Sequence, residues 1–478
     1  MTVSTFKRGL KLNTRKLATE GKAVELAPMP KQVVIPINQH FGAPNKVLVN
    51  IGDRVIRGQK IAEGLAPGPM TVPVHASISG VVKKIEPRSQ ANNTEGLCVL
   101  IETGPEAVEA DMFMSPLDPF TCSKEEALQR IRDAGIIGMG GAGFPTHVKL
   151  SPPPNKPVDI IIADGAECEP YLTTDEALMI GKPDVFVKGL AIVMKITGVG
   201  KAIIAMEDNK AALAPAIERE IQQANYPGEI KVRLCRTLYP QGGEKMLISA
   251  LTGREVPSGG LPMNCGCIVS NVGTLVAIAE AFTLGKPLIE RDLTVSGGAC
   301  RTPKNIRLPI GTVLSGLPKE FIDIDYGRLK KVICGGPMMG TTVSGTDIPI
   351  QKNTSGIILM TREEVAVWEE GPCIRCSRCI QNCPMQLSPV VMNGALNVDD
   401  MDEALDAGLL DCIECGSCSY ICPARIKLTQ RFRTGKQRLR NRQQLSRELS
   451  KEAQERAKKA ADARAAPFQQ PAEPSANT

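Results

Sequence analysis

Two cysteine runs with identical spacing constrain the fold of this chain more than any other feature of its sequence. In each run the cysteines are separated by two, two and three residues, and a proline follows the last one. Thiols at such short intervals on a tight loop can converge on one metal centre, and the grouping does not suit a secreted disulfide scaffold. The runs are Cys373, Cys376, Cys379 and Cys383 before Pro384, and Cys412, Cys415, Cys418 and Cys422 before Pro423.

This spacing matches the run of bacterial ferredoxins that carry two [4Fe–4S] clusters. In such a run the first three thiols bind one cubane, and the fourth, beside its proline, binds the other. A pair of four-cysteine zinc sites is the alternative, but zinc ribbons use paired Cys-x-x-Cys units separated by longer loops. The expected ligands are Cys373, Cys376, Cys379 and Cys422 for cluster 1, and Cys412, Cys415, Cys418 and Cys383 for cluster 2.

Charge is unevenly distributed along the 478 residues. The net charge is +6, but residues 423–464 contain 14 basic and four acidic side chains, so the remainder is mildly acidic. Aromatic residues make up only 3% of the chain, which argues against base stacking, and no nucleic-acid-reading motif accompanies the basic segment. No apolar run reaches the ~18–20 residues that span a bilayer, and the N-terminus lacks a signal-peptide pattern. We therefore expect a cytoplasmic protein that binds no nucleic acid.

Residues 30–104 alternate short strand patterns with Gly, Pro, Asp and Asn turns. The stretch from Val47 to Glu63 resembles a biotinyl/lipoyl-type barrel-sandwich domain. Carrier versions of that domain present a lysine on an exposed hairpin, and the comparable turn here, residues 66–73, has none. We interpret residues 30–110 as a structural or docking module, preceded by an N-terminal segment at 1–29.

The middle of the chain predicts an α/β domain at 120–284. Ser123 and Glu126 form a capping-box pattern that predicts a helix ending near Ala134. Further on, the pattern predicts strands at 158–163 and 199–206, and helices at 182–197, 211–224 and 271–283.

The rest of the chain predicts three more units. Residues 307–316 resemble part of a β-grasp ligand-binding module, which we place at 285–350. The cysteine runs predict a two-cluster ferredoxin-like domain at 365–428. A basic helix and a tail, disordered from about 466, are expected at 429–478. The fold class is thus a multidomain chain of α/β and α+β parts.

A glycine-rich loop from Gly138 to Gly143 fits the dinucleotide pattern G-x-G-x-x-G, with Asp164 about 20 residues further on. A Rossmann fingerprint must follow a strand and open a helix. Here a predicted helix precedes the loop and Phe144-Pro145-Thr146 follows it. We therefore reject the Rossmann interpretation.

A longer string, from Gly138 to Lys149, resembles the nucleotide-binding loop of the flavin-bearing subunit of respiratory complex I and of related hydrogenase flavoproteins. Three further segments resemble that family in the same order, namely residues 164–170, 239–244 and 270–275. Four matches in order are more specific than one glycine loop. Some positions depart from the family, because Ala166, Gly243 and Ser270 replace polar residues and Cys168 replaces a serine.

The resemblance implies non-covalent FMN as the hydride-transferring group, with NADH as its substrate and no catalytic protein side chain. Glycines let backbone N–H groups approach a phosphate, and Lys149 supplies a point charge. Carboxylates such as Glu167 can bind ribose or ribityl hydroxyls, and Glu169 is a possible nicotinamide contact; turn glycines and surface acids are the alternative interpretation. The implied cofactor residues are Gly138, Gly140, Gly141, Gly143, Phe144, Lys149, Asp164, Glu167, Cys168, Glu169, Tyr239, Gly242, Gly243, Glu244 and Asn271.

A nicotinamide delivers two electrons as a hydride, whereas [4Fe–4S] clusters accept one at a time, and a flavin connects the two. The order of the units over residues 5–430 resembles the RnfC component of the Rnf (Rsx) ion-translocating electron-transport complex, since the flavin-bearing protein of complex I has only one C-terminal cluster motif. The resemblance implies an NADH-linked subunit of a translocating oxidoreductase, peripheral on the cytoplasmic side of the inner membrane. Its implied partners are the other members of the complex and a ferredoxin-type protein.

Two other functions stay open at this stage. One is a soluble flavoprotein subunit of a hydrogenase or another oxidoreductase. The other is a non-enzymatic scaffold or redox sensor that carries clusters without flavin. The basic tail fits contact with anionic lipid or an acidic partner, and equally a solvated helix of mixed charge.

Overall fold

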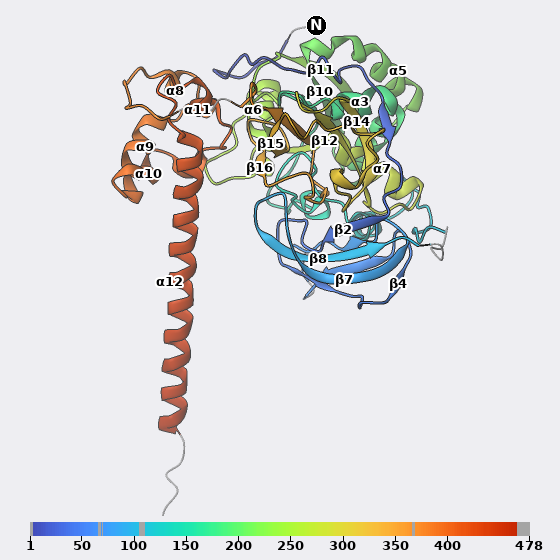
Figure 1. The fold of residues 1–478 in the computed structure, drawn as a ribbon, viewed down its shortest axis with the longest axis horizontal. Coiled ribbons are helices and arrows are strands. Elements are labelled where there is room, and N and C mark those ends of the chain that lie inside the picture. Colours follow the sequence, from blue (N-terminus) through green and yellow to red (C-terminus); the bar gives the residue numbers. More distant parts are fainter. Residues whose placement is uncertain (1–2, 66–67, 69, 105–109, 366–368, 466–478) are drawn as a thin grey trace, which may run out of the picture.

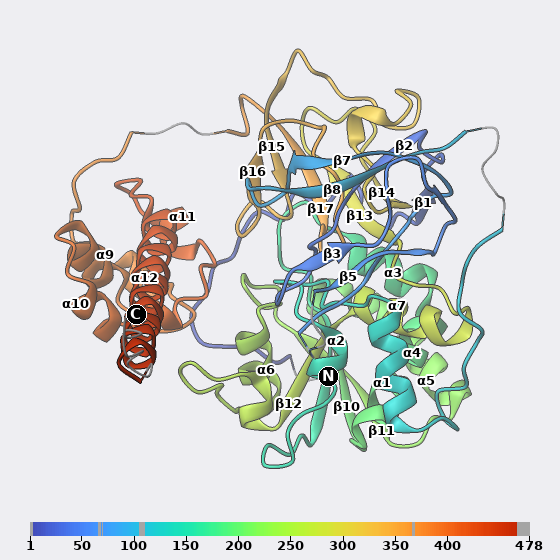
Figure 2. The same cartoon turned by 90° about the horizontal axis from the view of Figure 1, so that it is seen from below.

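The computed structural model describes residues 3–65, 68, 70–104, 110–365 and 369–465. A body of packed sheets and helices has the cysteine-rich region to one side, and one long helix projects from that region (Figure 1, Figure 2). The predicted tail from residue 466 and part of the carrier-type turn at 66–73 lie outside the described residues.

The barrel-sandwich module consists of two small antiparallel sheets around an apolar core. Its inward side chains alternate along the strands, as in Val33 and Ile35, which are fully buried while Gln32 is exposed. One sheet has the order β2-β8-β7-β4 and the other β3-β5-β6. The strands are β2 (Gln32–Pro36), β3 (Asn45–Val47), β4 (Arg54–Val55), β5 (Lys60–Gly64), β6 (Val74–His75), β7 (Gly80–Ser89) and β8 (Glu95–Glu102).

The α/β domain is built on a four-stranded parallel sheet with the order β11-β10-β9-β12. Three of its strands, β9, β10 and β12, are mostly apolar and buried, whereas the edge strand β11 alternates charged and apolar residues. The chain runs β9, β10, β11 in one direction and then places β12 on the other side of β9, so the sheet reverses its winding between β9 and β12. The strands are β9 (Ile160–Gly165), β10 (Lys201–Glu207), β11 (Glu229–Cys235) and β12 (Cys267–Asn271).

The helices of this domain pack closely enough to require a glycine at one contact. A Cβ on Gly189 of α4 would lie 2.0 Å from the main-chain oxygen of Leu275 in α7. The helices are α1 (Lys124–Asp133), α2 (Thr146–Lys149), α3 (Thr174–Gly181), α4 (Pro183–Thr197), α5 (Ala214–Ala224), α6 (Glu244–Thr252) and α7 (Val272–Thr283), with short 3-10 turns η1 (Asp208–Leu213) and η2 (Pro262–Cys265).

A six-stranded mixed sheet with the order β1-β14-β13-β17-β15-β16 forms the third unit. It extends beyond the predicted range of 285–350, because β1 comes from the N-terminal segment and β17 follows residue 350. Its β-grasp character stays a prediction. The elements are β1 (Val24–Leu26), β13 (Glu290–Ser296), β14 (Lys304–Pro309), β15 (Leu329–Cys334), β16 (Thr341–Val343), β17 (Gly356–Thr361) and the 3-10 turn η3 (Leu314–Gly316).

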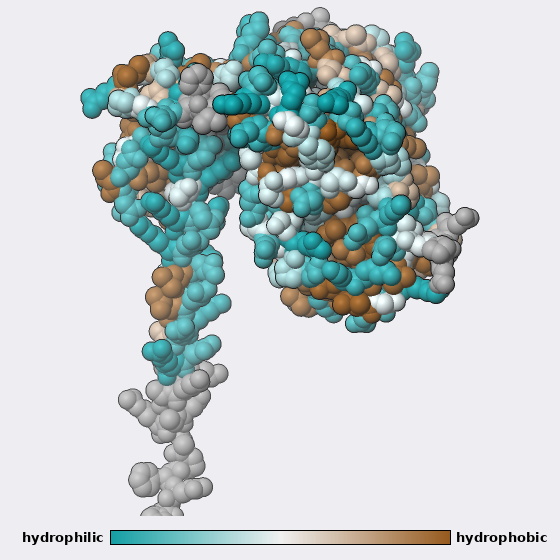
Figure 3. Space-filling model, viewed as in Figure 1, coloured by the Kyte–Doolittle hydropathy of each residue, from teal (hydrophilic) through white to brown (hydrophobic). Residues whose placement is uncertain are grey.

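The cysteine-rich region consists of short helices and the root of a 38-residue helix, α12. Phe432 on the first turns of α12 is fully buried, whereas Leu445 and Leu449 are each 57% exposed. Figure 3 shows the projecting helix as mostly hydrophilic with one apolar patch. In the described ranges, no helix combines the length and apolar character that crossing a membrane requires. The elements are α8 (Arg378–Gln381), α9 (Pro389–Asn397), α10 (Met401–Asp406), η4 (Leu409–Asp411), α11 (Ser417–Ile421) and α12 (Leu428–Ala465).

Local sequence signals predict several boundaries well. The capping box of α1 is confirmed, because Glu126 N–H donates to Ser123 Oγ (3.2 Å) and Ser123 N–H donates to Glu126 Oε2 (2.8 Å). One boundary is wrong: the predicted helix at 211–224 starts as a 3-10 turn and becomes α-helical only at Ala214, where Pro215 fits the first turn. The strands β11 and β12 and the helices α3 and α6 were not predicted individually.

Lys352 joins the barrel-sandwich module to the α/β domain. Its side chain is 1% exposed, and its Nζ donates to the main-chain oxygens of Pro73 (2.9 Å) and Gly135 (2.6 Å). Burial lowers the pKa of Lys352 to about 7. The N–H of Lys352 also donates to Gln39 Oε1 (2.9 Å).

Replacing Lys352 by Met should destabilise the junction of the two domains. The variant leaves the carbonyls of Pro73 and Gly135 buried without a donor, at a cost of about 1–3 kcal/mol each at most. We expect a lower melting temperature by circular dichroism than for the matched variant Lys330→Met, whose lysine lies exposed on β15. Equal melting temperatures for the two variants would show that Lys352 does not hold the junction.

Candidate functional site

The carboxyl ends of the four parallel strands bring three of the sequence-predicted segments to one edge of the sheet. Asp164 lies near the end of β9, the 239–244 loop follows β11, and Asn271 ends β12. In open α/β sheets, ligands bind at this edge where the winding reverses. That point lies here between β9 and β12, so the geometry selects the segments that the flavoprotein resemblance also selects.

The glycine loop reaches the same point from outside the sheet. Its ends are joined by a hydrogen bond from Gly138 N–H to Phe144 O (2.9 Å). Met139 N–H donates to Thr274 Oγ1 of α7 (3.0 Å), and a Cβ on Gly140 would lie 3.0 Å from the Cβ of Asn271. As expected, helix α1 precedes the loop, and the helix α2 that follows has only four residues.

The barrel-sandwich module supports the outer side of this loop. Phe41 N–H donates to Gly143 O (2.9 Å), and the rings of Phe41 and Phe144 stack with centroids 6.2 Å apart. The loop is thus held between two domains, with Gly140 and Gly141 exposed.

Asn271 links the strands at the reversal point to helix α3. Its Oδ1 accepts from Gly273 N–H (2.9 Å) and caps α7, while its Nδ2 donates to Asp175 Oδ2 (2.7 Å). Asp175 N–H in turn donates to Glu167 Oε1 (3.3 Å). Asp175 and Glu167 therefore form one polar chain with the cap of α7.

Several carboxyl groups gather at this edge, with Glu207 buried and Asp164 and Glu167 half-buried. Burial and the charge of Asp175 raise the pKa of Glu167 to about 8, and burial raises the pKa of Glu207, at the end of β10, to about 7. Burial likewise raises the pKa of Asp164 well above its usual value. Within the part of the chain that the structure describes, Glu167 Oε2 and Glu207 Oε1 accept no hydrogen bond. Both oxygens are buried acceptors that lack a donor among the described residues.

Other predicted residues have partners inside the protein. Both oxygens of Glu169 accept main-chain N–H bonds, from Met338 (3.0 Å) and Met339 (2.8 Å), and burial raises its pKa to about 7. Lys149 Nζ lies 2.8 Å from Glu244 Oε1. This ion pair leaves the Lys149 side chain a quarter exposed.

The 239–244 loop packs against the segment after β9. Gly242 N–H donates to Cys168 Sγ (3.3 Å), and a Cβ on Gly242 would lie 2.1 Å from Ala166 O, so this close approach requires glycine. Tyr239 points the other way: its hydroxyl donates to the main-chain oxygen of Cys415 (2.6 Å).

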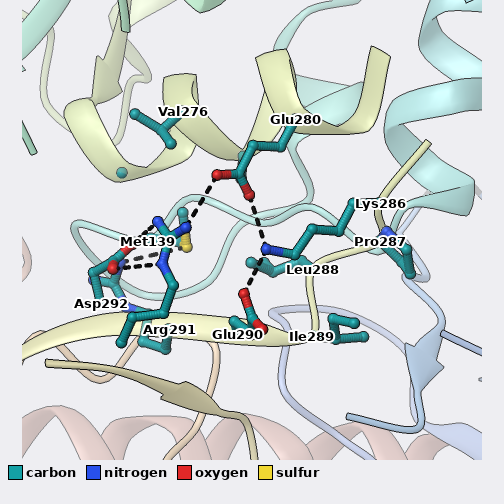
Figure 4. Close-up of a pocket in the computed structure, with 13 residues that line it drawn as sticks. Met139, Val276, Glu280, Lys286, Pro287, Leu288, Ile289, Glu290, Arg291 and Asp292 are labelled. Atoms are coloured by element: carbon teal, nitrogen blue, oxygen red, sulfur yellow. Dashed lines mark hydrogen bonds and ion pairs between the residues drawn. The ribbon is translucent and has the colours of Figure 1, made fainter. Parts of the chain in front are cut away.

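Sequence reasoning missed three charged residues of this region: Lys16, Glu207 and Arg291. Arg291 is 3% exposed, with Nε donating to Thr354 O (2.8 Å) and Nη1 3.6 Å from Met139 Sδ of the glycine loop. Figure 4 shows it lining a pocket of about 20 Å³ behind the loop. No motif marks these residues, because they reach the site from segments far away in sequence.

The same pocket contains a paired group of charges rather than an open ligand site. Glu280 on α7 lies between Lys286 (3.1 Å) and Arg307 (3.3 Å), and Lys286 also pairs with Glu290 (Figure 4). These pairs fix α7 against β13 and β14.

The eight cysteines of the two runs line two separate cavities. In the described residues, no three His, Cys, Asp or Glu side chains are arranged to hold a single metal ion. Each cavity instead combines three cysteines of one run with the last cysteine of the other, a donor set that suits a [4Fe–4S] cluster. The outer cavity, about 200 Å³, is lined by Cys373, Cys376, Cys379 and Cys422, and the inner cavity, about 20 Å³, by Cys383, Cys412, Cys415 and Cys418.

The two cavities differ in their surroundings. The inner cavity adjoins the α/β domain, through the bond from Tyr239 to Cys415 and one from Ser258 Oγ to Asp411 (2.8 Å). The outer cavity faces solvent, since Cys373 and Cys376 are exposed. One of the two sites therefore lies towards the carboxyl edge of the sheet, and the other lies towards the outside.

Family models match three parts of the chain. Residues 4–106 match the RnfC barrel sandwich hybrid domain, residues 131–280 the Nuo51 FMN-binding domain, and residues 366–423 the 4Fe-4S dicluster domain. These matches confirm the barrel-sandwich, flavoprotein-like and two-cluster assignments.

Curated relatives cover nearly the whole chain. The sequence is 43% identical to the C subunit of the proton-translocating ferredoxin:NAD+ oxidoreductase complex of Clostridium ljungdahlii, over 90% of this chain and 93% of that protein. This chain belongs to the RnfC family of ion-translocating oxidoreductase complexes. Its counterpart in the Na+-translocating complex of Acetobacterium woodii is 41% identical over 81% of this chain and 86% of that protein.

A further RnfC-family relative, from the ion-translocating oxidoreductase complex of Rhodobacter capsulatus, is 36% identical over 92% of this chain and 84% of that protein. A solved NAD+-reducing [NiFe]-hydrogenase aligns with 63% of this chain and 60% of its own, at 20% identity and a TM-score of 0.45, which is too low to carry an argument. The family resemblance found in the sequence is confirmed. As a member of the RnfC family, the chain has an FMN-binding domain and a 4Fe–4S dicluster domain.

Serine substitutions should sort the cysteines by cavity rather than by run. Cys383→Ser and Cys415→Ser should each abolish the same cluster signal in electron paramagnetic resonance of the reduced protein, and Cys422→Ser and Cys376→Ser the other. Each variant should contain about four irons instead of about eight. If Cys383→Ser removed the signal lost in Cys376→Ser, each run would bind its own cluster.

The raised pKa of Glu167 predicts a pH-dependent stability of the flavin-free chain. Since the pKa is about 8 in the folded chain and about 4.5 as its ordinary value, the folded state binds more protons between these pH values. The contribution of Glu167 to the free energy of unfolding therefore falls as pH rises from about 4.5 to about 8. Glu167→Gln should lose less stability than wild type between these pH values in urea unfolding. Glu125→Gln, on the exposed face of α1, should follow wild type.

Proposed function

We propose that this chain exchanges electrons between NAD(H), non-covalent FMN and two [4Fe–4S] clusters, as the cytoplasmic-side subunit of a membrane-bound NADH:ferredoxin-type oxidoreductase that translocates ions. One observation carries the proposal: the hydrogen bond from Tyr239 to Cys415 joins the edge of the FMN-binding domain to the inner cysteine-lined cavity. The two redox regions of one chain are thus adjacent.

The carboxyl edge of the parallel sheet supplies the FMN site in this proposal. The main-chain N–H groups of the exposed residues Gly140 and Gly141, with Lys149, hold the phosphate. Glu167 and Glu207 accept hydrogen bonds from ribityl, ribose or nicotinamide donors. When bound, FMN takes up a hydride and gives up single electrons. The residues of this chain bind and orient it.

The cysteine-rich region supplies the one-electron path. Cys412, Cys415, Cys418 and Cys383 hold the inner cluster, and Cys373, Cys376, Cys379 and Cys422 the outer cluster. The inner cavity lies beside the α/β domain and the outer cavity faces solvent. This placement supports an order in which the inner cluster faces FMN and the outer cluster faces the partner.

The family supports the setting of this function. The relatives from Clostridium and Acetobacterium carry the names of ferredoxin:NAD+ oxidoreductase complexes that translocate protons or Na+. We infer a peripheral subunit of the inner membrane whose partners are the other members of the complex and a ferredoxin-type protein, with no role for nucleic acid. The domain boundaries at 30–110, 120–284, 365–428 and 429–478 remain part of this proposal.

Anaerobic titration with NADH tests the proposal. The purified chain should contain FMN, iron and sulfide, and NADH should bleach the flavin band and then the broad cluster absorption. Lys149→Ala should weaken FMN binding at least about tenfold, because a phosphate loses its charged partner. Lys201→Ala, at the opposite edge of the sheet, should bind FMN as wild type does. A chain whose FMN and clusters stay oxidised in excess NADH would contradict the proposed substrate.

A further inference from the structure

The N-terminal segment crosses the same sheet edge before it enters the barrel-sandwich module. We call residues 4–19 the N-terminal strap. Ser4 N–H donates to Leu234 O (2.8 Å), and Leu10 and Tyr239 exchange two main-chain hydrogen bonds (both 2.8 Å). Further along, Tyr171 N–H donates to Thr14 O (2.8 Å). The strap is therefore fixed to the segments that follow both β11 and β9.

Lys16 is the residue by which the strap enters the site. Only 2% of it is exposed, and its Nζ donates to the main-chain oxygen of Glu167. An ammonium is costly to bury unless charges or acceptors surround it. Burial raises the pKa of four carboxyl groups from three elements, and the charge of Lys16 opposes that rise: Glu167 and Glu169 after β9, Asp175 on α3, and Glu207 on β10.

The other cations of this region are bound elsewhere. Lys210 Nζ lies 2.9 Å from Glu176 and also pairs with Glu20. Arg291 acts on Asp175 from behind the glycine loop, where it donates to Thr354 O. Lys16 is thus the cation that the strap adds to the acidic edge itself.

The bonding pattern of Lys16 is not that of a simple ion pair with Glu167. Here it takes the main-chain oxygen of that residue, while Glu167 Oε2 accepts no hydrogen bond from the described residues. Glu207 Oε1 also accepts no hydrogen bond from the described residues, and Glu207 is only 2% exposed. The positive charge of Lys16 lies among these carboxyl groups and offsets part of the cost of burying them.

Resting on the proposed function, we propose that Lys16 is a positioning residue of the flavin site, which holds the Glu167 main chain in place and offsets the buried carboxylates that face the cofactor. The N-terminal strap is then part of the cofactor site rather than a leader to the barrel-sandwich module. A hydroxyl- and amide-bearing ligand, such as the ribityl chain and ring of FMN, fits this combination of a fixed main chain and carboxyl oxygens that lack a donor in the described ranges.

The test compares FMN binding and the flavin midpoint potential in the full-length protein. Lys16→Met should raise the FMN dissociation constant about tenfold or more, measured by quenching of flavin fluorescence. It should also lower the midpoint potential of bound FMN in an anaerobic redox titration, because removing a nearby cation disfavours added electrons. Lys16→Arg, which keeps the charge, should restore both quantities. Lys11→Met, exposed on the same strap, should change neither.

The outcomes separate this inference from the proposed function. Wild-type protein that binds no FMN refutes the function itself. If wild type binds FMN and Lys16→Met matches it in affinity and potential, the inference about Lys16 is wrong. Should Lys16→Met fail to fold, Lys16→Arg decides: near wild-type affinity and potential support the charge role, and loss of FMN from a folded Lys16→Arg protein overturns it.

Discussion

The hydrogen bond between the Tyr239 hydroxyl and the carbonyl of Cys415 is the interaction on which the arrangement of the redox regions depends. Tyr239 is 2% exposed, so its hydroxyl needs a partner, and the partner it has lies within the second cysteine run. The main chain of Tyr239 is bonded to Leu10 at the same time. One residue therefore joins the α/β domain, the N-terminal strap and the cluster region.

The candidate flavin site depends equally on contacts that lie far apart in sequence. Its glycine loop is supported by Phe41 of the barrel-sandwich module, and its base is joined to that module through Lys352. The module lacks the exposed carrier lysine in the described part of its hairpin turn and instead forms a wall of the site. A domain type that elsewhere carries a prosthetic group on a mobile arm thus acts here as fixed support.

The sequence predicts those parts whose signals are local. The crossed grouping of the cysteines follows from their spacing, and the cap of α1 follows from Ser123 and Glu126, because both depend on residues a few positions apart. Lys16 and Lys352 could not be predicted, since a single lysine in a polar segment looks like any solvated surface residue. Their burial results from chain segments that meet only in the folded protein.

The same distinction explains the unpredicted sheet partners and the role of Glu169. Strand β1 has three residues and pairs with β14, about 280 positions away. No hydrophobic periodicity in the sequence predicts such a short strand. Glu169 matches the flavoprotein motif, yet its carboxylate holds the main chain of Met338 and Met339. A motif match identifies the residue type at a position. Neighbouring residues from other segments determine which partner its side chain binds.

Helix α12 gives the cluster region an unusual mechanical property. Its 38 residues rise about 57 Å, and among the residues whose side chains are described the clamped ones lie in the first turns, where Phe432 is buried and Gly435 lies against Leu396. A rod held at one end converts a small rotation at its root into a large displacement at its tip. Conversely, a force applied to its distal half acts with a long moment arm on the loops that carry the cysteines.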